Sequence, residues 1–143
     1  MSTPSKLPSS AHAERPAHPR FFGLMKASTV LLAAALLVQG ITAGQLLSSE
    51  GDSQLHDATG PFVTVAMVLQ IIAALLVWRA GHGSLRYLAA SAVLLVLIGI
   101  QFVVGGSGKL AVHVPLGVAL FGASAVLVAQ VWATRPRPHR PPI

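Results

Sequence analysis

Four long apolar segments fill most of the chain, and short polar stretches separate them. They cover residues 27–47, 61–78, 87–107 and 110–134, and none contains a charged residue. A helix crosses the hydrocarbon core of a bilayer with about 20 residues, within a range of about 17–25. The runs are continuous rather than alternating, which is typical of membrane helices and not of barrel strands. The pattern predicts an all-α integral membrane protein with four transmembrane helices in an up-down antiparallel bundle.

The boundaries of these segments predict one membrane domain between two tails. The four expected spans cover about 24–48, 56–79, 84–106 and 110–133, within a domain over 21–134. Residues 1–20 are rich in Ser, Pro, Ala and His, which predicts a disordered tail. Residues 135–143 alternate Arg and Pro and predict a second, basic and proline-rich tail. The first span exceeds the roughly 7–15 apolar residues of a secretory signal, so we expect it to be retained.

Charged residues are scarce and lie mostly on one side of the predicted bundle. They make up 10% of the chain, against about a quarter in a soluble domain. The tails and the loop between spans two and three hold nine of the ten bases: Lys6, Arg15, Arg20, Lys26, Arg79, Arg86, Arg135, Arg137 and Arg140. The two other loops hold Glu50, Asp52, Asp57 and the remaining base, Lys109. Since cytoplasmic segments carry an excess of Lys and Arg, we predict a multi-pass protein of the bacterial inner membrane with both termini in the cytoplasm.

The net charge of +6 does not indicate a nucleic-acid partner, because its residues follow the membrane boundary. Basic flanks instead favour anionic lipid headgroups. The expected partner is therefore the lipid bilayer, with no nucleic acid. The chain has no cysteine, which excludes disulfides and thiolate metal sites.

A short motif, His-x-x-x-Gly, opens two of the four spans. It occurs as His56 to Gly60 at the start of span two and as His113 to Gly117 at the start of span four. Residues four apart lie on the same face of a helix, one turn from each other. Each motif thus places an imidazole beside a residue that has no side chain.

The motif belongs to a weak internal repeat. Gln39 precedes the first copy and Gln101 precedes the second, so the chain is predicted to consist of two tandem hairpins related by a pseudo-two-fold axis. Both histidines then lie near the outer face at similar depth. Each histidine alone is explained as an interface residue, and hydrogen bonds between helices, worth about 0.6 kcal/mol, explain the glutamines. The matched pair of histidines favours a shared ligand.

The ligand that best suits two opposed imidazoles is a haem. We predict that His56 and His113 bind the iron of a b-type haem from both sides, and that Gly60 and Gly117 make room for the edge of the macrocycle. Zinc fits less well, because it normally takes three or four protein ligands and only nearby aspartates are available. Iron with both axial positions filled favours electron transfer over oxygen activation. We therefore expect an electron carrier and not an enzyme.

The position of Pro61 leaves the start of span two undetermined. Pro61 is suited to the first turn of a helix, which would leave His56 in the preceding loop. If the helix starts earlier, Pro61 lies inside it and kinks it. Pro115 raises the same question for His113.

These features carry a resemblance to a known family. Histidines at the outer ends of the second and fourth helices, 57 positions apart (113 − 56), resemble one half of a haem A synthase, an eight-helix family built of two such bundles. The segment from Gln101 to Gly117 is also similar to small bacterial four-helix membrane proteins. The resemblance covers about 22–132 and implies that His56 and His113 are axial ligands. The acidic residue that the synthases carry before the histidine is missing, and only one bundle is present, so synthase activity is not implied.

Two other functions are compatible with the sequence. One is a scaffold or accessory subunit without a cofactor, whose histidines lie only at the membrane interface. The other is a small-molecule carrier, which is disfavoured because the four apolar segments contain no Asp, Glu, Lys or Arg to couple ions. A carrier of four spans would also need to oligomerise. The further partners expected are a membrane redox protein or a second copy of the chain.

Overall fold

The computed structural model describes residues 20–48 and 53–134, and this part of the chain is almost entirely helical. Its helices are α1 (Phe22–Leu47), α2 (Ser53–Arg79), α3 (Leu85–Gly106) and α4 (Leu110–Ala133). Each is long and apolar enough to cross a membrane. The prediction of an all-α bundle with four membrane helices is confirmed.

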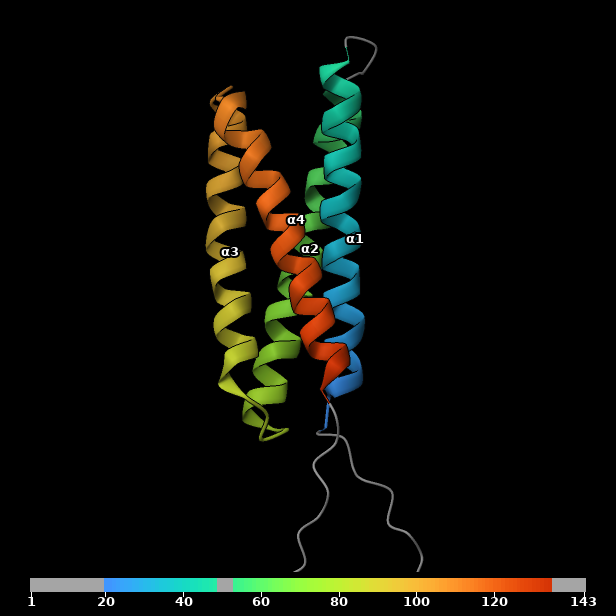
Figure 1. The fold of residues 1–143 in the computed structure, drawn as a ribbon, viewed down its shortest axis with the longest axis vertical. Coiled ribbons are helices and arrows are strands. Elements are labelled where there is room, and N and C mark those ends of the chain that lie inside the picture. The colour runs from blue at the N-terminus through green and yellow to red at the C-terminus, as the bar shows by residue number, and fades with distance from the viewer. Residues whose placement is uncertain (1–19, 49–52, 135–143) are drawn as a thin grey trace, which may run out of the picture.

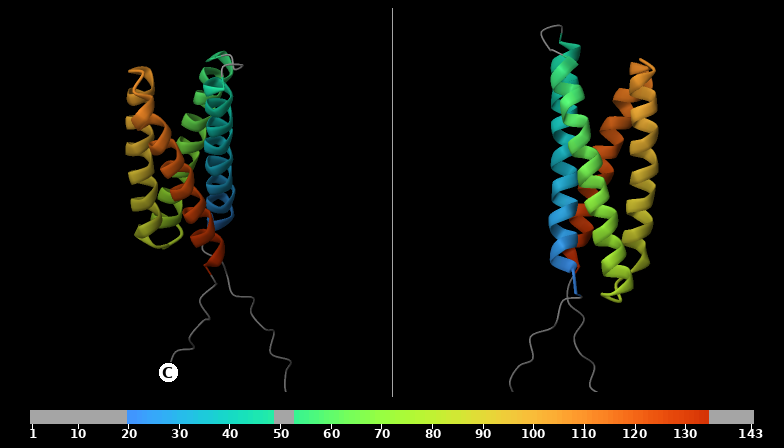
Figure 2. Two further views of the ribbon diagram at one scale, coloured as in Figure 1. Left: turned by 45° about the horizontal axis from the view of Figure 1, so that its top comes forward. Right: turned by 180° about the vertical axis from the view of Figure 1, so that it is seen from behind.

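The helices run alternately up and down and form a ring (Figure 1). Each packs against its neighbours in the chain, and α1 also packs against α4. Arg20 and Thr134, the ends of the described chain, lie at one end of the bundle, which we call the terminal end. The end of α1, the start of α2 and the turn from α3 to α4 lie at the opposite end, which we call the histidine end. Figure 2 shows the two hairpins diverging toward the histidine end.

The helix bounds answer the question raised by proline. α2 begins at Ser53, three residues before the predicted start, so His56 lies inside the helix and Pro61 is an interior residue. Pro115 is likewise inside α4. Each proline lacks the N–H that would bond to the carbonyl four residues earlier. The other helix ends lie within two residues of the predicted spans. The predicted tails lie outside the described residues, apart from Arg20.

The core is apolar along most of its length, but the terminal half contains one buried polar cluster. Gln70 of α2 is fully buried. Its Oε1 accepts a hydrogen bond from the Ser28 hydroxyl of α1 at 2.8 Å, and its Nε2 donates to the Ser91 hydroxyl of α3 at 3.0 Å. One glutamine thus connects three helices. The sequence analysis did not predict this cluster.

Basic residues gather at the terminal end. Arg20, Lys26, Arg79 and Arg86 lie there, each with its cationic group over an aromatic ring. Lys109 lies directly before the first residue of α4, at the histidine end of the bundle. Cations and aromatic rings at one end are typical of a membrane boundary. That the terminal end faces the cytoplasm stays a prediction.

Candidate functional site

The structure brings His56 and His113 together at the histidine end. Their ring centroids are 6.0 Å apart and their planes are inclined by 81°. His56 lies in the first turn of α2 and His113 in the first turn of α4. Both side chains are half-buried. Residues 57 positions apart in the chain therefore form one site between the two hairpins.

The glutamine of each hairpin bonds to the histidine of the same hairpin. Gln39 Nε2 donates to the His56 carbonyl at 3.1 Å, and Gln101 Nε2 donates to the His113 carbonyl at 2.9 Å. A helical carbonyl has a second lone pair, so it accepts this bond in addition to its bond within the helix. The same contact on both sides indicates that the weak sequence repeat corresponds to a repeated hairpin structure.

The glycine of each motif gives access to that glutamine. A Cβ atom at Gly117 would lie 3.0 Å from Gln101 Nε2, and one at Gly60 would lie 3.7 Å from Gln39 Nε2 and 3.4 Å from a ring carbon of Phe102. A side chain at Gly117 would thus press on the Gln101 amide, whereas the contacts at Gly60 are ordinary van der Waals distances. That these glycines accommodate a macrocycle edge remains a prediction. The contact with the Gln101 amide is a second physical reason for a glycine in the motif at Gly117.

A backbone carbonyl fixes the tautomer of His113. Its Nδ1 lies 3.2 Å from the carbonyl oxygen of Gln101. Because a carbonyl only accepts, Nδ1 must carry the proton, and Nε2 keeps a free lone pair. This arrangement is the usual one for a histidine that binds a metal through Nε2.

The Thr42 hydroxyl is the contact that can hold His56 in the same tautomer. Nδ1 of His56 lies 3.1 Å from Thr42 Oγ1, and that hydroxyl donates to the Gln39 carbonyl at 3.1 Å. When the Thr42 proton is directed to this carbonyl, the hydroxyl accepts from Nδ1–H of His56; the same oxygen also lies 3.4 Å from Thr59 Oγ1. Thr42 therefore links His56 to the carbonyl of Gln39. In the other hairpin, His113 contacts the corresponding carbonyl, that of Gln101, directly. Both rings are left with Nε2 as the available donor atom.

Gly105 of α3 is a site residue that the sequence analysis missed. A Cβ at this position would lie 2.7 Å from Cε1 and 2.9 Å from Nδ1 of His113, closer than real Cβ contacts allow. The imidazole thus packs directly on the backbone of α3. A glycine next to a turn is expected for other reasons, so no signal in the sequence distinguishes it.

Two imidazoles are the whole donor set that this part of the chain offers. Among the described residues no group of three or more His, Cys, Asp or Glu side chains could hold a metal ion. Such a pair suits a group that brings its own remaining ligands better than a bare zinc ion. The site also holds an unsatisfied acceptor, because Gln101 Oε1 is buried without a hydrogen-bond partner.

In comparison with known proteins, the chain matches no family model, no curated protein and no solved structure.

Proposed function

We propose that the chain binds a b-type haem between His56 and His113 and carries electrons near the outer face of the bacterial inner membrane. The observation that supports this most is the meeting of the two rings at 6.0 Å with both Nδ1 atoms already engaged. The proposal rests on this chain's own residues, together with the resemblance to half of a haem A synthase.

The separation of the rings suits two axial ligands. A histidine nitrogen bonds to a metal at about 2.0–2.1 Å and lies about 1 Å from the centre of its ring, so two opposed imidazoles on one metal have centroids about 6 Å apart. The observed 6.0 Å agrees with this value. The rings therefore need little change in separation to serve as a pair.

The residues behind the rings have a defined role in this proposal. The Gln101 carbonyl and the Thr42 hydroxyl hold Nδ1 protonated, which orients each ring and makes Nε2 a stronger donor. A haem held in this way supplies a reversible one-electron couple at iron. With both axial positions filled by protein, no position stays open for oxygen, which favours electron transfer.

A second candidate function, a cofactor-free accessory bundle, is favoured by one observation. Gln39 and Gln101 bond to the histidine carbonyls, and the absence of a side chain at Gly117 leaves room for the Gln101 amide. The polar residues of both motifs thus have a structural reason that requires no ligand. A partner membrane protein would then be the functional contact.

Absorption spectroscopy of the purified full chain distinguishes the two. In mild detergent with added hemin, the haem proposal expects a Soret band and, after reduction, the sharp α and β bands of six-coordinate iron. The double change His56→Ala and His113→Ala should abolish these bands, and each single change should remove the six-coordinate features. The matched control is His82→Ala, because His82 lies in the loop between α2 and α3 at the terminal end.

Two results would reject the haem proposal. One is a colourless protein that takes up no hemin, with His56→Gln and His113→Gln leaving its stability unchanged, which would favour the accessory bundle. The other is a haem spectrum that the double variant leaves intact, because the iron would then be bound elsewhere.

A further inference from the structure

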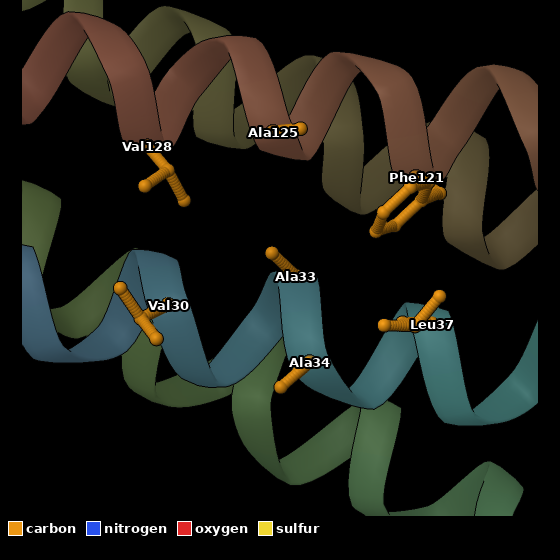
Figure 3. A pocket seen from close by; sticks show the side chains of 7 residues that line it. All are labelled: Val30, Ala33, Ala34, Leu37, Phe121, Ala125 and Val128. Atoms are coloured by element: carbon orange, nitrogen blue, oxygen red, sulfur yellow. The ribbon is translucent and has the colours of Figure 1, made fainter.

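A groove lies between α1 and α4, along the middle of both helices. The groove is open on the outside of the bundle and its lining is entirely apolar. Figure 3 shows Val30 facing Val128 at one end and Leu37 near Phe121 at the other, with Ala33 and Ala125 between them. The small alanines leave the groove hollow in the middle, and the larger side chains border it at both ends.

A cation lies at the end of the groove that is nearer the terminal end of the bundle. Lys26 is four residues before Val30 on α1, and Trp132 is four residues after Val128 on α4, so both continue the faces that line the groove. The Lys26 ammonium is 5.0 Å from the centre of the Trp132 ring and 5.9 Å from that of Phe22. It therefore bridges α1 and α4 where the groove ends.

The Lys26 charge has no anionic neighbour in the described part of the chain. The one acidic residue described there, Asp57, lies in α2 near the histidine end. The partners of Lys26 are aromatic rings, which leave its positive charge uncompensated. A lysine beside a tryptophan at a helix end is typical of the headgroup region of a bilayer.

We infer that this groove and Lys26 form a binding site for an anionic phospholipid. The phosphate would pair with the Lys26 ammonium and one acyl chain would lie along the groove toward Phe121. From Lys26 to Leu37 (37 − 26) the helix rises about 16 Å, at about 1.5 Å per residue. That length matches one leaflet, because half of a hydrocarbon core of about 30 Å is about 15 Å.

A second copy of the chain is a poorer occupant of the groove. Two membrane subunits related by a two-fold axis along the membrane normal present the same residues at the same depth. A dimer through this groove would place two Lys26 ammonium groups near each other without a described carboxylate between them. Like charges at such an interface oppose association.

Fluorescence quenching by brominated lipids tests the inference. Trp78→Phe leaves Trp132 as the sole tryptophan, since the chain has two. The variant is placed in phosphatidylcholine vesicles that contain brominated phosphatidylglycerol or, at the same mole fraction, brominated phosphatidylcholine. We expect Trp132 to prefer the anionic quencher about fivefold, the factor expected for one lysine near an anionic headgroup.

Further variants separate the site from the bulk lipid. In the same background, Lys26→Gln should abolish the preference, Lys26→Arg should retain it, and Ala125→Leu should reduce it by filling the groove. Lys109→Gln at the histidine end and Ala123→Leu, on α4 outside the groove, are the matched controls and should leave it unchanged. Equal quenching by both lipids, or a preference that survives Lys26→Gln, would overturn the inference. So would a dimer that forms only when Ala125 is present and that shields Trp132 from both quenchers.

Discussion

Gln101 and His113 are joined at two points. The side-chain amide of Gln101 donates to the His113 carbonyl at 2.9 Å, and the backbone carbonyl of Gln101 lies 3.2 Å from His113 Nδ1. One residue of α3 thus fixes both the backbone and the ring of the histidine on α4. In the other hairpin Gln39 makes the first contact directly and the second through Thr42.

The glutamine contact should stabilise each hairpin by a measurable amount. We expect Gln101→Leu to lower the free energy of unfolding by about 0.6 kcal/mol, the average for a side-chain hydrogen bond between membrane helices. Gln39→Leu should lower it by about 1.2 kcal/mol, because Gln39 Nε2 also donates to Thr59 Oγ1 at 2.9 Å. Reversible unfolding of the purified protein in detergent measures the change. Gln130→Leu is the control, because Gln130 lies exposed on α4. Equal effects at all three positions would show that the carbonyl contacts contribute nothing specific.

Gly105 should be the most sensitive position around the site. Gly105→Ala places a methyl group 2.7 Å from Cε1 of His113, so the ring must move. We expect a loss of hemin affinity of tenfold or more, similar to the loss of an orienting contact at a metal site. Hemin titration followed by absorbance measures this, and the nitrogen resonances of the imidazole report the ring position without any cofactor.

The matched control for this change is Gly99→Ala on the same helix. A Cβ at Gly99 meets nothing within 4 Å. It should leave the His113 resonances and the hemin affinity unchanged. If both alanine variants behave alike, the close packing of His113 on α3 does not matter for the site.

The sequence predicted the helices well and the site only in part. Uninterrupted apolar runs of membrane length determine the spans, because the bilayer requires both the length and the satisfied backbone. The starts of α2 and α4 are left open by the sequence, since Pro61 and Pro115 each permit a helix that begins before or after the histidine. The repeated His-x-x-x-Gly motif predicts that the two histidines belong to one site, because it recurs at the same place in each hairpin.

The supporting residues could not be predicted, because their roles depend on contacts between helices. Thr42 contacts His56 across α1 and α2, and Gly105 contacts His113 across α3 and α4. Periodicity places residues on a face of one helix but does not fix the rotation of the next helix against it. Gln70 is a similar case, since a glutamine in an apolar run gives no indication of which serines it meets.

Thr42 should control the tautomer of His56. Thr42→Val keeps the shape of the side chain and removes the oxygen that accepts from Nδ1. We expect the proton of His56 to redistribute between Nδ1 and Nε2, and hemin affinity to fall about tenfold. Nitrogen chemical shifts of the imidazole measure the tautomer directly. Thr42→Ser restores the hydroxyl and should restore both readouts, whereas an unchanged tautomer in Thr42→Val would contradict the assignment.

Gln70 should contribute more to stability than Gln101, because its side chain bonds to two other helices and that of Gln101 bonds to one. With about 0.6 kcal/mol for each bond, Gln70→Leu should lower the free energy of unfolding by about 1.2 kcal/mol.

A double-mutant cycle with Ser91→Ala isolates one bond. The Nε2 of Gln70 donates to the Ser91 hydroxyl at 3.0 Å, so the two changes should be less than additive by about half of the total effect. The same cycle with Gln130 in place of Gln70 should be additive, because the Gln130 side chain is exposed on α4 and makes no hydrogen bond to the buried Ser91. Additivity in both cycles would show that the buried cluster does not couple α2 to α3.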